Sequence, residues 1–272
     1  MHSEKGLTNI LIFGEIGNGK STLGNQLLGY NTFNTTNDTN RGTNATIGIR
    51  GKKEKNNLFV IDTPGFLNEE EDEKNMIQII EYLKKNKKLN AILVVLNYQQ
   101  VRFSQSIQIM IKLLCAIFPK KNIAEHIAFI FTNAFTKRGN LSSEQKEVKI
   151  NKILPEFRKV IEEATTTKVG NIISGFVDID SDEGINSDGE FDLERIVEWA
   201  TSLDNLFEES QNQKDDFQKL KDDFQKLKDE NEQFKEEIER LKIDIILKDK
   251  KYQKEFDDIK NEISQLKNMK NN

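Results

Sequence analysis

The chain has 272 residues, of which 31% are charged and 36% hydrophobic, with a net charge of −5 at pH 7 and a mean hydropathy of −0.63. This length supports one sizeable hydrophobic core with an extension, while the negative charge argues against a general nucleic-acid binder. One cysteine and two histidines exclude an intramolecular disulfide framework and make a zinc site implausible. Because no secretory signal or bilayer-length apolar run is present, we expect a cytoplasmic protein.

The strongest motif is a glycine-rich loop between a strand-like and a helix-like segment. Residues 14–21 read GEIGNGKS, after the apolar run ILIF and before TLGNQLL. Such a loop turns its backbone N–H groups inward at a helix N-terminus, where they bind phosphate. We predict that Lys20 reaches the β- and γ-phosphates of a nucleotide, and that Ser21 places its hydroxyl on Mg²⁺. The predicted nucleotide-binding residues of this loop are Gly14, Glu15, Ile16, Gly17, Asn18, Gly19, Lys20, Ser21 and Thr22.

A long polar segment follows at residues 30–46, rich in Asn, Thr and Gly. A long loop between two nucleotide motifs is usually functional. In GTPases this is the first switch, where a threonine meets Mg²⁺ and the γ-phosphate. Thr43 is therefore a candidate catalytic and metal-binding residue, with Thr46 as the alternative. Arg41 is a candidate arginine finger, in its own chain or across a dimer.

The next predicted strand, LFVI at residues 58–61, ends in the sequence DTPG at 62–65. In P-loop nucleotide-binding proteins, an Asp at such a strand end holds Mg²⁺. A glycine lets its backbone N–H approach the γ-phosphate closely. We therefore predict Asp62 as a metal ligand and Gly65 as the γ-phosphate sensor. Phe66 stands where Ras-type enzymes orient water with a glutamine, so we expect slow hydrolysis, on the order of 10⁻⁴ to 10⁻³ s⁻¹.

Apolar segments alternate between strand and helix patterns up to about residue 206, which predicts a three-layer α/β fold with a mostly parallel sheet. The predicted strands lie near residues 7–13, 45–50, 58–62, 91–97, 127–132 and 171–178. The predicted helices lie near residues 20–29, 72–86, 103–117, 143–165 and 190–208. Both motifs follow strands, and ligands of such folds bind beyond the carboxyl ends of the strands.

From residue 207 onward, apolar residues recur at alternating spacings of three and four, which predicts a coiled coil. The seven residues 215–221 are repeated as 222–228. The seam comprises Phe217, Leu220, Phe224, Leu227, Asn231, Phe234, Ile238, Leu241 and Ile245, then, after a stutter near Lys248, Tyr252, Phe256, Ile259, Ile263 and Leu266. Asn231 suits a register-setting position of a two-stranded coil. We therefore predict a nucleotide-binding domain at 1–206 and a coiled coil at 207–272, formed between chains or as a hairpin.

Several motifs together resemble one GTPase family. They are the glycine-rich loop at 14–21, the DTPG at 62–65, the strand AILVVL at 91–96 with Arg102-Phe103-Ser104, and a loop that begins Thr132-Asn133. We call this last loop the base loop, because it follows the strand after which many GTPases bind the nucleotide base. This set resembles the immunity-associated GIMAP-type (AIG-type) GTPases, in the septin-like branch that also contains the chloroplast Toc import GTPases. The resemblance covers about residues 7–205 and leaves out the predicted coiled coil.

This resemblance implies GTP and GDP with Mg²⁺, dimerisation across the bound nucleotide, and generally slow hydrolysis. It places Asn133 where Toc-like members have a histidine on the base. It also places Asp178 where an acidic residue accepts hydrogen bonds from guanine, with Asp180 and Asp182 as alternatives. A calcium-binding loop in this acidic stretch is disfavoured, because the spacing to a bidentate Glu is absent.

Two functional hypotheses follow. The favoured one is a GTP-dependent switch that forms homodimers or homo-oligomers and acts through its coiled coil on an unknown protein partner. It involves no nucleic acid and at most indirect contact at a membrane surface. The alternative is a coiled-coil scaffold whose G domain binds nucleotide constitutively and does not switch. An ATPase is a third hypothesis, which lacks support from the family resemblance.

Overall fold

The computed structural model divides the chain into two compact units, Met1–Gln213 and Lys214–Asn272, which are described separately. The predicted boundary, between residues 206 and 207, lies seven residues before this division. The residues that the structure describes are 6–34, 46–53, 56–66, 69–100, 103–118, 123–133, 135–136, 139–140, 143–170, 172–177, 187–207, 226, 229, 233, 236–237, 239–256 and 259–260.

The first unit is built on a six-stranded sheet with the order β2-β3-β1-β4-β5-β8. Its strands are β1 (Thr8–Gly14), β2 (Ile47–Lys53), β3 (Asn56–Asp62), β4 (Ala91–Asn97), β5 (Ile127–Thr132) and β8 (Ile173–Phe176). Strand β2 pairs antiparallel with β3, and the other neighbours pair in parallel. A small hairpin, β6 (Phe135–Thr136) and β7 (Gly139–Asn140), stands apart from this sheet.

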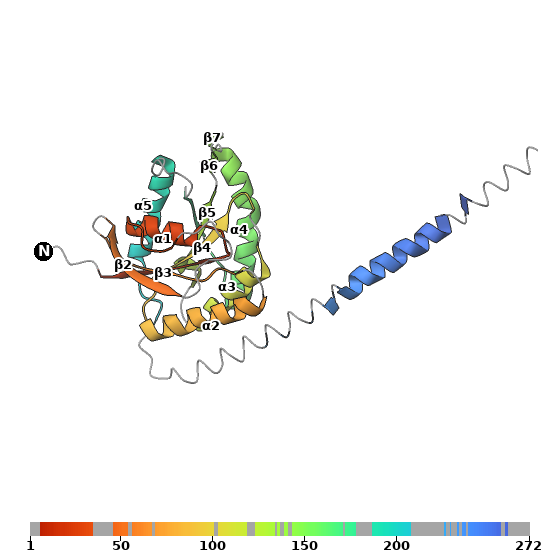
Figure 1. The fold of residues 1–272 in the computed structure, drawn as a ribbon, viewed down its shortest axis with the longest axis horizontal. Helices are drawn as coiled ribbons and strands as arrows, with labels where there is room; N and C mark the ends of the chain where they lie inside the picture. The colour runs from red at the N-terminus through yellow and green to blue at the C-terminus, as the bar shows by residue number, and fades with distance from the viewer. Residues whose placement is uncertain are drawn as a thin grey trace, which may run out of the picture. The chain divides into compact units, whose positions relative to one another are not determined.

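Helices cover both faces of the sheet (Figure 1). They are α1 (Lys20–Leu28), α2 (Glu69–Asn86), α3 (Gln105–Ile117), α4 (Ser143–Thr165) and α5 (Ser187–Ser202), with a short 3₁₀ helix at Ile123–His126. Helices α1 and α5 share one hydrophobic cluster with Ile10 and Ile12 of β1. On the opposite face, Phe157 of α4 stacks on Phe129 of β5, and α2, α3 and α4 pack side by side. Because both faces are covered, the central strands are apolar along nearly their whole length.

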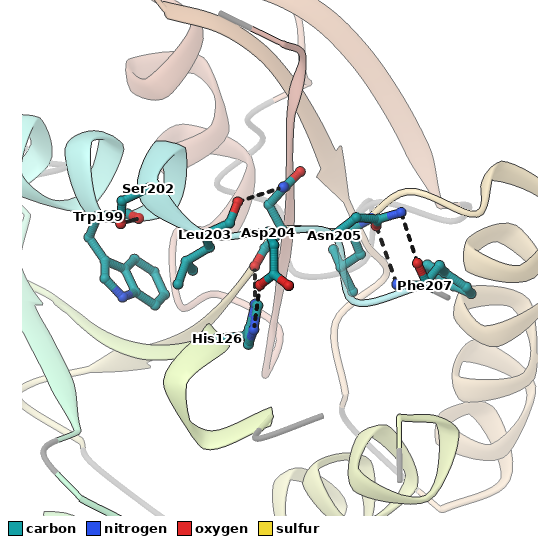
Figure 2. Close-up of polar contacts among 9 residues, drawn as sticks. His126, Trp199, Ser202, Leu203, Asp204, Asn205 and Phe207 are labelled. Carbon is teal, nitrogen blue, oxygen red and sulfur yellow. Dashed lines mark hydrogen bonds and ion pairs between the residues drawn. The ribbon is translucent and has the colours of Figure 1, made fainter. Parts of the chain in front are cut away.

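The predicted helix at residues 190–208 ends earlier, at Ser202. The segment that follows is bonded to residues at the amino-terminal ends of the strands. Asn90 Nδ2 donates to the Leu203 carbonyl (3.0 Å), and Leu206 N donates to the Leu89 carbonyl (2.7 Å). Figure 2 shows this segment beside His126, whose Nε2 lies 3.7 Å from Asp204 Oδ1. These contacts hold residues 203–206 against the amino-terminal edge of the sheet, so α5 does not continue beyond Ser202.

The second unit is helical over residues 239–256. Large apolar side chains are exposed along it, namely Leu241, Ile243, Ile245, Ile246, Leu247, Tyr252 and Phe256, and Ile259 is exposed in the next described stretch. Much of the predicted seam, including Asn231, lies outside the described residues. Within the part of the chain that the structure describes, no helix is both long enough and apolar enough to cross a membrane.

Candidate functional site

The glycine-rich loop connects β1 to α1 and needs its glycines for two different reasons. Gly14 has φ 155°, and a Cβ there would lie 2.3 Å from the carbonyl oxygen of Val95 in β4. Gly17 and Gly19 have φ values of 80° and 84°, in the left-handed region that favours glycine. Gly19 is the N-cap of α1. The first helical N–H groups, which have no acceptor within the helix, therefore open into the loop.

Lys20, the first residue of α1, is buried under the loop, with 6% of its surface exposed. Its Nζ donates to the Glu15 carbonyl oxygen over 3.0 Å, which bends the side chain back across the loop. Burial disfavours the charged amine and lowers the pKa of Lys20 to about 8, although the charges of Asp62 and Glu15 act in the opposite direction. A cationic side chain held beside the free N–H groups of a helix N-terminus is suited to binding an anion.

Ser21 and Asp62 meet across the site. The Ser21 hydroxyl donates to Asp62 Oδ2 over 2.6 Å, although the two residues are 41 positions apart in the sequence. Asp62 ends β3, is 1% exposed, and also accepts from Thr63 N over 3.1 Å. A hydroxyl and a carboxylate are the hard oxygen donors that Mg²⁺ prefers, so this pair fits the metal chemically. In the described ranges no three His, Cys, Asp or Glu side chains gather as a metal site, so these two residues would need further oxygens from water and phosphate.

The DTPG segment lies directly on the glycine-rich loop. A Cβ at Gly65 would be 2.7 Å from the backbone nitrogen of Ile16, so only a glycine fits there. The next residue, Phe66, forms a parallel bridge with Glu15. The two nucleotide motifs that the sequence predicts separately are therefore joined by backbone contact.

The base loop is anchored to the glycine-rich loop by two residues whose roles the sequence did not reveal. The Thr132 hydroxyl donates to the Asn18 carbonyl over 2.8 Å, and Asn18 Nδ2 donates to the Val95 carbonyl over 3.0 Å. Asn18 was predicted as a nucleotide-binding residue of the loop, and its side chain is bonded to strand β4. Asn133 follows with φ 54°, a left-handed turn at the carboxyl end of β5. Thr132 is fully buried at the end of β5; in the sequence only its place directly after the apolar run 127–131 pointed to such a contact.

The remaining residues that the sequence analysis singled out fall into two groups. Some have a structural role, and others lie outside the described residues. Ser104 is the N-cap of α3, and its side chain accepts from Ile107 N over 3.3 Å. Phe103 packs edge-on against Phe157, with ring centroids 4.2 Å apart. Five candidate site residues lie outside the described residues, namely Arg41, Thr43, Asp178, Asp180 and Asp182. Arg102 of the family motif also lies outside them. Thr46 is described and lies just before β2.

The sheet order, the glycine-rich loop at the start of α1 and the aspartate at the end of β3 define a P-loop GTPase fold with a mostly parallel sheet. The AIG1 family matches residues 8–168, more than half of the chain. The chain belongs to the AIG1 family.

Solved structures agree on the fold. Toc33 from Arabidopsis thaliana in complex with GDP and Mg²⁺ is 16% identical, with a TM-score of 0.53 over 72% of this chain and 83% of that one. A dimerization-deficient Toc33 mutant from the same plant is also 16% identical, with a TM-score of 0.55 over 72% of this chain and 83% of that one. A third structure comes from work on dimerization and GTPase activity of the chloroplast translocon components atToc33 and psToc159. It is 16% identical, with a TM-score of 0.56 over 76% of this chain and 85% of that one. Comparison with curated protein sequences gives no match.

Proposed function

We propose that this protein is a guanine-nucleotide switch that binds GTP or GDP with Mg²⁺ at the carboxyl edge of its sheet. The observation that carries the proposal is the joint placement of Lys20, Ser21 and Asp62 around one glycine-rich loop. A triphosphate would add negative charge beside the buried Lys20 amine, and Mg²⁺ would add positive charge beside the buried Asp62 carboxylate. Each partner of the nucleotide complex therefore compensates a group that is costly to bury alone.

Specificity for guanine rests on family membership and on two residues. Asn133 stands in a left-handed turn beside the predicted base site, with its amide able to donate and accept hydrogen bonds. Asp178 is proposed to accept from the guanine N1–H and N2–H₂ groups. GDP with Mg²⁺ in the Toc33 structure supports the same ligand class for this fold. An excess of ATP that displaces labelled GDP as well as GTP does would contradict guanine specificity.

We propose that hydrolysis is slow in the isolated chain. Phe66 is 1% exposed and carries no group that orients water. Thr43 remains the proposed switch threonine that meets Mg²⁺, and Arg41 the proposed arginine finger. Dimerization is named as important for GTPase activity in the chloroplast components atToc33 and psToc159, which supports a rate that rises when two G domains pair.

The C-terminal unit is proposed to form a coiled coil that passes the nucleotide state to a protein partner. Five seam residues in the described helical part are exposed in the single chain, namely Leu241, Ile245, Tyr252, Phe256 and Ile259. A second helix on this stripe would remove that apolar surface from water. The proposed location is the cytoplasm, with membrane contact only through a partner.

The test is a nucleotide titration of the purified chain with GDP and with a non-hydrolysable GTP analogue. Lys20→Ala is expected to abolish detectable binding while the thermal transition persists. Ser21→Ala is expected to remove the Mg²⁺ dependence of affinity. Lys159→Ala is the matched control, because this lysine side chain is 77% exposed on α4. Affinity within a few-fold of wild type in Lys20→Ala would show that the loop does not bind the phosphates.

One observation favours a second function, the constitutive nucleotide-bound scaffold. Phe66 and Gly65 pack on the glycine-rich loop, so the proposed γ-phosphate sensor is joined to the rest of the site by backbone contact. If this contact is the same with GDP and with GTP, the G domain transmits no change to a partner. The two functions differ in whether oligomer size depends on the nucleotide.

A further inference from the structure

The side chain of Phe66 is turned toward the protein interior. It meets Phe13 of β1 edge-on, with ring centroids 6.2 Å apart. Both rings are fully buried. The position that in Ras-type enzymes orients water is here occupied by a hydrophobic anchor. The function of Phe66 therefore depends on the backbone segment that its buried ring fixes in place.

The backbone on either side of this anchor pairs with the glycine-rich loop. Phe66 N donates to the Gly14 carbonyl over 3.2 Å, and Ile16 N donates to the Phe66 carbonyl over 3.1 Å. These two bonds flank Glu15 in the manner of a parallel strand ladder. The pairing of β1 with β3 is thus resumed beyond the end of both strands.

The register of that pairing changes by one residue. Ile12 is opposite Asp62, but Glu15 is opposite Phe66. Two residues on the β1 side and three on the β3 side lie between these pairs, so the β3 side carries one extra residue. We call residues 63–65 the bulge, since they accommodate this extra residue as a β-bulge does. Bulges re-aim the chain locally, often beside active sites. Here the bulge contains Gly65, the predicted γ-phosphate sensor.

The bulge presses Gly65 onto the loop and fixes its peptide. A Cβ on Gly65 would be 2.4 Å from Ile16 Cγ1. Asn75 Nδ2, from α2, donates to the Gly65 carbonyl over 3.2 Å. Since Phe66 N also donates to the Gly14 carbonyl, the peptide unit that follows Gly65 is held at both of its polar atoms. The Gly65 N–H belongs to the preceding peptide, so these bonds restrict it through the backbone of Gly65 alone.

We propose that Phe66 is a positioning residue: its buried ring anchors the bulge and the peptide that follows Gly65, and so limits the orientations in which the Gly65 N–H can meet the γ-phosphate. This inference rests on the proposed function. Ordering the sensor during folding removes an entropy cost from the binding step. Only GTP carries a γ-phosphate. A substitution of the Phe66 ring keeps the backbone groups that bond to Gly14 and Ile16, so its effect is expected mainly on the preference for GTP over GDP.

The experiment measures the affinities of GDP and of a non-hydrolysable GTP analogue, both with Mg²⁺, in the full chain. Phe66→Ala is expected to lower affinity for the analogue about 10- to 100-fold, the range of one hydrogen bond to a charged group, while GDP affinity stays within about threefold. Phe66→Leu, which keeps an apolar anchor, is expected to retain most of the ratio. Asn75→Ala releases the Gly65 carbonyl and is expected to change the ratio in the same direction, which provides a second reading if Phe66→Ala does not fold.

Phe157→Ala is the matched control, because this phenylalanine is equally buried and stacks on Phe129 away from the loop. It is expected to lower the melting temperature without changing the GTP-to-GDP affinity ratio. Phe66→Gln is expected to behave as Phe66→Ala does and to bring no gain in hydrolysis, since its side chain enters the interior beside Phe13.

An unchanged ratio in Phe66→Ala and Asn75→Ala would overturn the inference, as would faster GTP hydrolysis in Phe66→Gln. Equal losses of GDP and analogue affinity in Phe66→Ala would show a purely structural role and also overturn it. Failure of the proposed function is a different result, because wild-type protein would then bind neither nucleotide.

Discussion

The buried amine of Lys20 makes the nucleotide-free protein less stable than it need be. The pKa of this side chain falls from 10.5 to about 8, chiefly because burial disfavours the charged form. Each pKa unit corresponds to about 1.4 kcal/mol, so keeping Lys20 charged at pH 7 costs folding about 3 kcal/mol. Lys20→Met keeps the apolar stem and removes the charge. It also loses the bond to the Glu15 carbonyl, so we expect a net stabilisation of about 1 to 3 kcal/mol.

The pH dependence gives the sign of this effect. Below pH 8 both folded and unfolded chains carry a charged Lys20, and the full cost is present. Between pH 8 and 10.5 the folded state has released the proton while the unfolded state still binds it, so wild-type stability rises with pH. Lys20→Met lacks this contribution. Its advantage over wild type is expected to shrink by about 2 kcal/mol between pH 7 and pH 9.5.

The assay is thermal unfolding of the nucleotide-free chain in chelator at several pH values. For a domain of this size, about 2 kcal/mol shifts the melting temperature by about 4 to 8 °C. With GDP in large excess the order is expected to reverse, because only wild type gains binding energy. Lys159→Met, on an exposed lysine, is expected to change neither curve. A Lys20→Met protein that is less stable than wild type at pH 7, or whose advantage does not depend on pH, would show that burial of the charged amine does not destabilise the fold.

Three further predictions concern other parts of the G domain. Burial raises the pKa of the Cys115 thiol to about 12, so alkylation at pH 8 is expected to be very slow in the native protein and fast after denaturation; rapid native labelling would contradict its burial. Ser104→Ala removes the N-cap of α3 and is expected to cost about 1 kcal/mol in urea unfolding without altering GDP affinity. A fragment that ends at residue 207 is expected to fold and bind nucleotide, whereas one that ends at residue 202 loses the Leu206 contacts to the amino-terminal edge of the sheet and is expected to unfold at lower temperature; equal melting temperatures would contradict this role.

The sheet could be predicted from the sequence because its strands are locally unambiguous. The run AILVVL at 91–96 is apolar on both faces, which suits a central parallel strand and little else. The glycine-rich loop is equally local, since its spacing alone places Gly17, Gly19 and Lys20 in a turn before a helix. Short-range patterns therefore predicted where the site lies on the sheet.

What the sequence did not predict depends on contacts between distant segments. The bond from Asn90 to the Leu203 carbonyl ends α5 early, and its partners are 113 residues apart. Thr132 and Asn18 are separated by 114 residues. The bulge at Gly65 depends on the register between two strands, which no spacing within either strand encodes. For the same reason Phe66 was interpreted only as a missing catalytic group, and its packing on Phe13 became visible in the fold.

The central claim, a switch driven by guanine nucleotide, is tested most directly by light scattering of the full chain. The mass is measured without nucleotide, with GDP, and with a non-hydrolysable GTP analogue, each with Mg²⁺. Whatever assembly the coiled coil sets in the GDP state, the analogue is expected to double the mass, because two G domains then pair. An identical mass in all three states, with nucleotide binding demonstrated in the same samples, would contradict the switch and leave the scaffold function.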